Sequence, residues 1–199
     1  IDPLYYRLRA ARPEWLARER LTLAWLRTHL ADDCYLSWSG GKDSMVMVHL
    51  CRRINYRLPI LCSDSGVPFR WTAEDKDLIE RWCAVQGWTI RSFQWDKWGT
   101  TADAATADED AYRRAVHGTQ FAALDAWAYA HGFARRVDGM RASEMGPRRI
   151  FLLRCRGVAA HSLHPLWNWS CEDVWTYMVA HRIPWLSIYD HLGPEARNN

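Results

Sequence analysis

The chain has 199 residues, which suits one domain around a single hydrophobic core. Its formal net charge is +3, and 23 of its 26 basic residues are arginines, which can reflect genome composition or supply bidentate contacts to phosphate or sulfate. No apolar run approaches the ~20 residues of a membrane span, and charged residues interrupt the start of the chain, so we expect a cytoplasmic protein without a membrane anchor.

The first predicted element is an amphipathic helix between Pro13 and Leu30, where apolar residues recur at helical spacing among charged ones. A strand over about 34–38 follows, and then the run Ser39-Gly40-Gly41-Lys42-Asp43-Ser44 leads into a helix over about 44–56. A strand that enters a Gly-rich turn and then a helix aims several backbone N–H groups at one point, where the helix dipole favours an anion. The turn is therefore predicted to bind phosphate.

The phosphate turn does not follow the Walker A pattern. That pattern requires Gly at position 36 and Ser or Thr at position 43, where this chain has Leu36 and Asp43. A second strand over about 59–63 completes a βαβ unit, which implies parallel strands and a right-handed crossover. The turn Asp64-Ser65-Gly66 then lies beside the first turn, at the edge where open α/β sheets bind ligands.

The alternation of strands and helices continues along the chain. We predict strands at about 88–93 and 134–140 and helices at about 71–86, 111–131 and 171–182, the last with Ser170 as N-cap. The polar residues 94–110 are either a lid near the site or an ordinary surface insertion. The pattern predicts a three-layer α/β fold, with a mostly parallel twisted sheet of about five strands and helices on both faces.

Three motifs, in order, carry a family resemblance. Ser39–Ser44 resembles the pyrophosphate loop of the ATP pyrophosphatase (adenine nucleotide alpha hydrolase-like) superfamily, which cleaves ATP between its α and β phosphates. Gly139-Met140-Arg141-Ala142-Ser143-Glu144 with Arg148 resembles the Gly-x-Arg-x-x-Glu…Arg pattern of phosphoadenosine phosphosulfate reductases and of the ATP sulfurylase small subunit. His164-Pro165-Leu166-Trp167-Asn168-Trp169, Glu172-Asp173-Val174-Trp175 and Ile183-Pro184-Trp185 resemble the Pro-Leu-x-x-Trp…Asp-x-Trp…Ile-Pro stretch of the same proteins.

The resemblance implies a nucleotide site. The loop from Ser39 to Ser44 would hold the pyrophosphate of ATP with Lys42 near the β and γ phosphates, and Asp64, Gly66 and Gly139 would lie at neighbouring turns. Asp43 and Asp64 are candidate Mg²⁺ ligands, because Mg²⁺ beside phosphates needs only one or two carboxylates. Capping of its own helix is the alternative for Asp43.

The same resemblance assigns Arg141 and Arg148 to the sulfate or phosphate end of the nucleotide. A planar guanidinium suits this role because it donates two parallel hydrogen bonds to an oxyanion, each contributing on the order of 1.5–3 kcal/mol. The alternative for Arg141 is a salt bridge to Glu144, and for Glu144 we favour the role of orienting Arg141. Arg149 is predicted to be a surface residue.

The departures from the family bear on the reaction. Family reductases carry a catalytic Cys in a Glu-Cys-Gly-containing tail, no such motif occurs up to Asn199, and Lys42 is retained although several reductases lose it. We therefore expect an ATP-using enzyme that adenylylates an oxyanion or nucleic-acid acceptor in sulfur metabolism or sulfur transfer. The six cysteines of the chain include no Cys-x-x-Cys pair, and this argues against a zinc or iron–sulfur centre. A sulfonucleotide reductase and a non-catalytic nucleotide-binding subunit are the alternatives.

The expected organisation is one domain in two parts. Residues 1–33 form a helical segment packed on residues 34–199, which carry the pyrophosphate loop and the nucleotide site. ATP and Mg²⁺ are the expected cofactors. The expected partners are an adenine nucleotide and a second protein or a second copy of the chain, and nucleic acid is left open as the acceptor.

Overall fold

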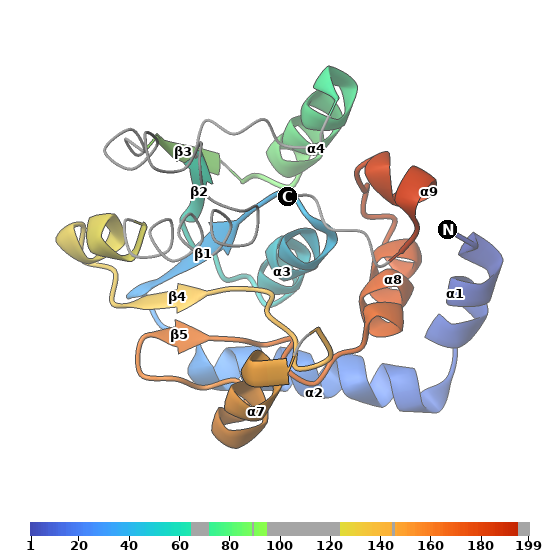
Figure 1. The fold of residues 1–199 in the computed structure, drawn as a ribbon, viewed down its shortest axis with the longest axis horizontal. Coiled ribbons are helices and arrows are strands. Elements are labelled where there is room, and N and C mark those ends of the chain that lie inside the picture. Colours follow the sequence, from blue (N-terminus) through green and yellow to red (C-terminus); the bar gives the residue numbers. More distant parts are fainter. Residues whose placement is uncertain (65–71, 89, 95–123, 145, 195–199) are drawn as a thin grey trace, which may run out of the picture.

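The computed structural model describes residues 1–64, 72–88, 90–94, 124–144 and 146–194, and these form a parallel sheet with helices on both faces (Figure 1). The sheet has five strands in the order β3-β2-β1-β4-β5. They are β1 (Cys34–Trp38), β2 (Ile60–Asp64), β3 (Ile90–Gln94), β4 (Arg135–Val137) and β5 (Ser162–Leu163). All four neighbouring pairs run parallel. The predicted fold class is confirmed.

The order of the strands reverses at β1. β2 pairs with β1 on one side, with Leu36 opposite Ile60, and β4 pairs with it on the other, with Leu36 opposite Val137. The helix α3 (Lys42–Arg53) connects β1 to β2, so the predicted βαβ unit is present. Open α/β sheets bind ligands outside the carboxyl ends of the strands at such a reversal, which here is the predicted phosphate turn.

Three of the remaining described helices lie where the sequence predicted them, and other described elements were not predicted. Those expected over about 13–30, 71–86 and 171–182 are α2 (Pro13–His29), α4 (Ala73–Val85) and α8 (Cys171–Ala180). Ser170 caps α8, as predicted, through a capping box with Asp173. The sequence did not reveal four elements: α1 (Pro3–Ala10), α7 (Gly146–Cys155), β5 and α9 (Ile188–Leu192). Residues 95–110 of the predicted loop and 111–123 of the predicted helix lie outside the described residues, whereas residues 124–130 are helical.

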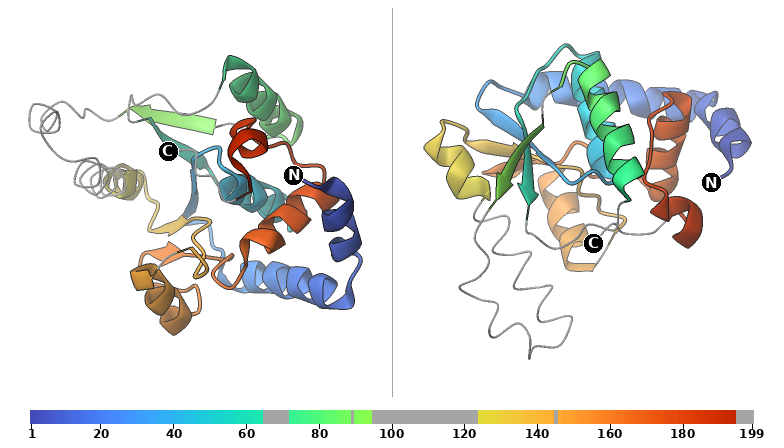
Figure 2. Two further views of the ribbon diagram at one scale, coloured as in Figure 1. Left: turned by 45° about the vertical axis from the view of Figure 1, so that its right-hand side comes forward. Right: turned by 90° about the horizontal axis from the view of Figure 1, so that it is seen from above.

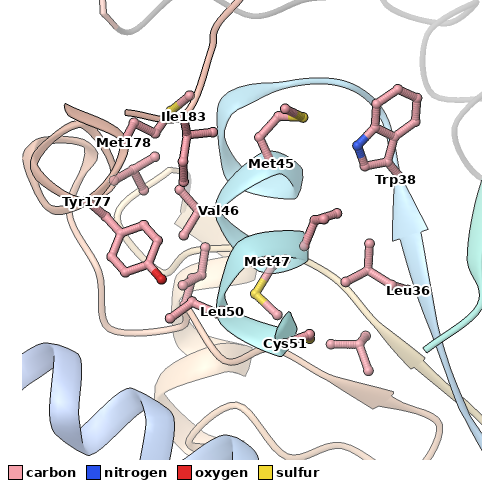
Figure 3. Close-up of a cluster of buried hydrophobic side chains, with 14 of the residues drawn as sticks. Leu36, Trp38, Met45, Val46, Met47, Leu50, Cys51, Tyr177, Met178 and Ile183 are labelled. Carbon is pink, nitrogen blue, oxygen red and sulfur yellow. The ribbon is translucent and has the colours of Figure 1, made fainter. Parts of the chain in front are cut away.

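Two apolar clusters cover the two faces of the sheet. On one face, α3 is buried on nearly all sides between β1 and α8, and Figure 3 shows Leu36 and Trp38 on its strand side and Tyr177 and Met178 across from it. On the other face, Tyr35 of β1 packs with residues of β2 and of the helix at 124–130. Because successive side chains of a strand point to opposite faces, neighbouring β1 residues enter different clusters.

The N-terminal helices are held against α8. Arg9 of α1 donates to Asp173 Oδ1 at 2.7 Å and to Thr176 Oγ1 at 2.8 Å. Trp169, just before α8, donates from Nε1 to Thr22 Oγ1 of α2 at 3.0 Å. Together with the apolar contacts of both helices, these bonds join residues 1–33 to the main core. Among the described helices, none is long and apolar enough to cross a bilayer.

Two histidines lie between α2, α3 and α8. His49 Nδ1 is 2.9 Å from the Tyr177 hydroxyl, and His181 Nε2 is 3.0 Å from Glu19 Oε1, a carboxylate that also pairs with Arg53. Burial lowers the pKa of His49 to about 4, helped by the nearby His181. Burial, and after it the charge of Arg53, lower the pKa of His181 to about 4.

These shifts predict a loss of stability in mild acid. Between the unfolded histidine pKa of about 6.5 and the folded value of about 4, the unfolded chain binds more protons than the folded chain, so the free energy of unfolding falls as pH falls through that window. Urea unfolding of the wild type and of His49→Gln at pH 7 and pH 4.5 checks this, because the variant should lose less stability. His131→Gln, at an exposed position, is the control. Equal losses in all three proteins would contradict the prediction.

Candidate functional site

The predicted phosphate loop joins β1 to α3 at the point where the strand order reverses. Gly40 has a φ of 71°, a left-handed conformation that favours glycine, and Gly41 is the N-cap of α3. Two serines brace the turn from inside. Ser44 Oγ donates to the Gly41 carbonyl at 2.8 Å, and the backbone N–H of Ser39 donates to Ser44 Oγ at 3.4 Å. These hydrogen bonds within the turn fix its conformation around the first residues of α3.

The first N–H groups of α3 differ in their partners. The N–H of Lys42 donates to the Tyr189 hydroxyl at 3.2 Å, whereas the N–H groups of Asp43 and Ser44 find no acceptor among the described residues. A helix start carries a partial positive charge, and unpaired N–H groups there are donors for an anion. The geometry therefore matches a small anion-binding site at the mouth of the loop.

Three charged side chains meet beside these donors. Lys42 Nζ lies 3.3 Å from Asp43 Oδ2, and Arg141 Nε lies 2.6 Å from Asp43 Oδ1. Lys42 is only 5% exposed and Arg141 only 2%. Burial has the largest single effect on the pKa of Lys42 and lowers it, but the Asp43 carboxylate together with Tyr189 and Cys171 makes the net shift upward. Both cations therefore stay charged, with Asp43 as the anion between them.

The guanidinium of Arg141 contacts three side chains of this protein. Its Nε forms an ion pair with Asp43 without hydrogen-bond geometry, and it donates from Nη1 to Ser143 Oγ at 3.1 Å and from Nη2 to Glu144 Oε1 at 2.9 Å. The salt bridge to Glu144 is the alternative that the sequence had left open for Arg141. The structure thus brings Arg141 to the phosphate loop, as expected of a site residue, but with its donors directed at this chain's own oxygens.

Gly139 allows the turn after β4 to touch the loop. A Cβ at this position would lie 2.8 Å from Asp43 Cβ and 3.1 Å from the Asp43 backbone carbon, closer than side-chain carbons approach one another. Glycine is therefore required here for close approach. This contact sets the position of Arg141, two residues further on, relative to Asp43.

A buried acid–histidine pair supports the same turn. Asp138 Oδ1 accepts from the Met140 N–H at 3.1 Å and lies 2.6 Å from His164 Nδ1, and Arg136 Nε lies 3.1 Å from the other carboxylate oxygen. Burial has the largest single effect on the pKa of Asp138 and raises it, but the hydrogen bond and charge of His164, the charge of Arg136 and the Met140 N–H together lower it. Sequence analysis names His164 only as part of a motif and gives it no role. Its position directly before Pro165 and Leu166 in that motif is the one sequence feature that singles it out.

Tyr189 is the second residue that sequence analysis missed. It lies on α9, is 1% exposed, and its ring centre is 5.4 Å from Lys42 Nζ. Ser187 holds the start of α9 in place, because its N–H and its hydroxyl each contact the Asp75 carboxylate at 2.8 Å. The end of the described chain thus contributes directly to the loop.

Three other predicted residues are only partly described. Asp64 ends β2 beside the loop, and Arg148 lies in the first turn of α7, but the side chains of both fall outside the described residues, as does all of Gly66. Arg149 is exposed, as predicted. The structure thus brings Ser39–Ser44, Gly139 and Arg141 together.

Of the two predicted magnesium ligands, only Asp43 has a described side chain, since that of Asp64 lies outside the described residues. Asp43, one of the two predicted ligands, is neutralised by Lys42 and Arg141. A Mg²⁺ ion at Asp43 would have to displace these cations, so we assign no step of the chemistry to a metal.

Comparisons with known proteins agree with this architecture. The family model described as "Phosphoadenosine phosphosulfate reductase domain" matches residues 33–192. A phosphoadenosine 5'-phosphosulfate reductase of Xanthomonas oryzae pv. oryzae (strain PXO99A) is 26% identical over 175 residues, which cover 84% of this chain and 70% of that protein.

Two solved structures show the same fold. A phosphate complex of the phosphoadenylyl-sulfate reductase from Candida auris aligns with a TM-score of 0.58 and 15% identity, covering 87% of this chain and 84% of that chain. The FMN adenylyltransferase of Candida glabrata, in complex with ATP, aligns with a TM-score of 0.59 and 18% identity, covering 88% of this chain and 58% of that one.

Proposed function

Since the chain belongs to the phosphoadenosine phosphosulfate reductase domain family, we propose that it binds an adenine nucleotide with the phosphates at the loop Ser39–Ser44. One observation carries this proposal. The unpaired N–H groups of Asp43 and Ser44 and the buried ammonium of Lys42 converge at the carboxyl end of β1, where the strand order reverses. A phosphate chain satisfies all three donors at once, which no group of the described protein does.

ATP is the proposed nucleotide, and adenylyl transfer is the proposed reaction. An oxyanion of the acceptor attacks the α phosphorus, a new P–O bond forms, the bond from the α phosphorus to the bridging oxygen breaks, and pyrophosphate leaves. Lys42 stabilises the negative charge that develops on the leaving pyrophosphate. No side chain acts as a nucleophile. The fold likeness to an adenylyltransferase described in complex with ATP supports this reaction.

Arg141 and Arg148 are our candidates for the oxyanion end of the acceptor. A guanidinium has five N–H donors, and Arg141 directs two of them at Ser143 and Glu144, so further donors are available to an added oxyanion. Its ion pair with Asp43 also positions the first turn of α3. Gly139 and the Asp138–His164 pair hold the turn from which Arg141 extends.

The test is release of pyrophosphate from ATP by the purified chain, with sulfate, sulfite and single-stranded nucleic acid as separate acceptors. We expect turnover with one acceptor class and an adenylylated product in equal amount. Nucleotide binding without pyrophosphate release from any acceptor would instead support a non-catalytic nucleotide-binding subunit. Failure to bind ATP would contradict the proposal.

A sulfonucleotide reductase is the second candidate, favoured by the name of the curated relatives. That reaction needs an accessible thiolate to attack sulfur and a second thiol to resolve the thiosulfonate. Five of the six cysteines are buried, and only Cys155 of α7 is partly exposed, with Sγ 3.7 Å from the Leu152 carbonyl. Sulfite release from a sulfonucleotide with reduced thioredoxin, lost in Cys155→Ser, would favour this function over adenylyl transfer.

Replacing Asp43 with asparagine is expected to tighten the binding of inorganic pyrophosphate about tenfold. The carboxylate now serves as the anion for Lys42 and Arg141, and the isosteric amide removes its charge without removing its volume. Isothermal titration with pyrophosphate, in buffer without divalent cations, measures the change. Glu144→Gln is the control, because it removes a carboxylate from Arg141 but not from Lys42. Weaker binding in Asp43→Asn would show that the carboxylate is needed for the ligand.

A further inference from the structure

A groove outside the phosphate loop, with none of the residues Ser39–Ser44 in its lining, has no assigned role. It has a volume of about 570 Å³ and is lined by residues of α1, α4 and the segment that follows α8. These elements follow one another along one side of the molecule in both Figure 1 and Figure 2. Ile183, Pro184 and Trp185 belong to the lining, and none of the lining residues is acidic.

The wall formed by α4 carries an apolar stripe that the described chain covers only in part. Trp82 packs partly against the main core, whereas Leu78 and Val85 on either side of it are exposed. Leu78, Trp82 and Val85 recur at i, i+4 and i+7, so they share one face of the helix, and all three line the groove. Val85 is 80% exposed and Leu78 is 45% exposed. A stripe with this spacing is what an amphipathic helix buries against a second helix.

The charge around the groove is entirely positive. Arg7 of α1, Arg81 of α4 and Arg182 after α8 all line it. Arg81 is paired with Asp77 at 2.5 Å, whereas Arg7 and Arg182 have no carboxylate partner among the described residues. An occupant with carboxylates beside an apolar stripe would complement both the arginines and the apolar lining.

Arg182 lies where the chain turns after α8. It has a φ of 53° and directly follows the C-cap of α8, and the next N–H, of Ile183, returns to the Met178 carbonyl at 2.9 Å. Helices commonly place glycine at this left-handed position, because a side chain is disfavoured there. Glycine at position 182 would therefore keep the backbone conformation while removing the guanidinium.

We propose that this groove is a docking site for an acidic amphipathic helix of a protein partner. The helix lies between α1 and α4, with its apolar residues against Leu78, Trp82 and Val85 and its carboxylates directed at Arg7 and Arg182. We choose a helix as the occupant because the groove runs between helices and its wall is apolar, which suits the apolar face of an amphipathic helix, and an acidic one because both unpaired side chains at the groove are cationic. This surface is separate from the proposed nucleotide site and does not depend on it.

The first experiment uses three synthetic helical peptides with the same apolar stripe and with flanking residues that are all Glu, all Gln or all Lys. Fluorescence anisotropy against the full chain measures their affinities. We expect the Glu peptide to bind at least tenfold more tightly than the Lys peptide, with a preference that weakens as salt rises. Absence of binding by the Glu peptide, or equal binding of the Glu and Lys peptides, overturns the proposal.

The second experiment uses Arg182→Gly. Because glycine suits the left-handed backbone, this variant should melt at a temperature equal to or above that of the wild type, yet bind the Glu peptide at least fivefold more weakly. Arg156→Gly is the matched control, since Arg156 has a φ of 48° after α7 but does not line the groove. Equal peptide affinity in wild type and Arg182→Gly overturns the proposal.

A second copy of this chain is the competing occupant. Sedimentation velocity of the wild type and of Val85→Arg over a hundredfold concentration range detects it. We expect both proteins to sediment as the same species throughout. Self-association of the wild type that Val85→Arg removes would assign the groove to a dimer and overturn the proposal of an acidic partner helix.

Discussion

Replacing Lys42 with alanine is expected to weaken ATP binding on the order of 100-fold and to abolish pyrophosphate release. The Lys42 ammonium is 5% exposed and lies beside the unpaired N–H groups of the loop, so it meets the phosphates in a poorly solvated place. Charge-assisted hydrogen bonds to such groups contribute on the order of 1.5–3 kcal/mol each, and Lys42 can make two with a phosphate chain. Asp43 keeps Arg141 as its partner, so the fold should persist.

The measurement is a nucleotide titration of the variant beside a melting curve. Lys76→Ala is the control, because Lys76 is a largely exposed lysine that pairs with Glu80 on α4. It should leave ATP affinity unchanged. If Lys42→Ala binds ATP with wild-type affinity and retains turnover, the loop is not the phosphate site. If Lys42→Ala has also unfolded, Lys42→Met is used instead. Methionine keeps most of the apolar part of the lysine side chain, so this variant removes the charge while preserving the packing.

Replacing Gly139 with alanine is expected to destabilise the fold by about 1–3 kcal/mol, the usual cost of inserting a methyl group into a packed contact. It should also weaken nucleotide binding at least tenfold. The new Cβ would lie 2.8 Å from Asp43 Cβ and 3.2 Å from the Asp43 carbonyl oxygen, so the turn after β4 must move away from the first turn of α3. That movement pulls Arg141 from Asp43 and disturbs the helix start that presents the N–H groups.

Urea unfolding and a nucleotide titration separate the two effects. Gly132→Ala is the control, since a Cβ there meets nothing within 4 Å and only its φ of 86° opposes the substitution. We expect Gly132→Ala to lose stability while keeping its affinity for nucleotide, whereas Gly139→Ala loses both. Wild-type affinity in Gly139→Ala would show that the contact between the turn and the loop is dispensable.

Asp43 is the shared carboxylate partner of two buried cations at the loop, Lys42 and Arg141, and the N–H of Lys42 donates to Tyr189. A buried charge without a partner is costly, so Asp43 stabilises both cations in the folded protein. This charge balance accounts for an Asp at this position of the loop.

The sequence by itself determined the parallel βαβ unit, the position of the phosphate loop and the start of α8. Each depends on signals between residues close in the chain: an apolar run before Ser39, two glycines at the turn, and Ser170 three residues before Asp173. It also placed Arg141 in the site, through a motif resemblance. Elements with weak local patterns were missed, among them β5, which has only two residues.

Only the tertiary structure decided how the site is assembled. Tyr189 reaches the N–H of Lys42 across 147 positions of sequence, and Gly139 meets Asp43 across the gap between β4 and the loop. The partners of Arg141 likewise depend on how closely that turn packs on α3. No periodicity or local spacing encodes such contacts, because they arise when parallel strands bring their carboxyl ends to one edge and side chains from separate elements share the same buried space.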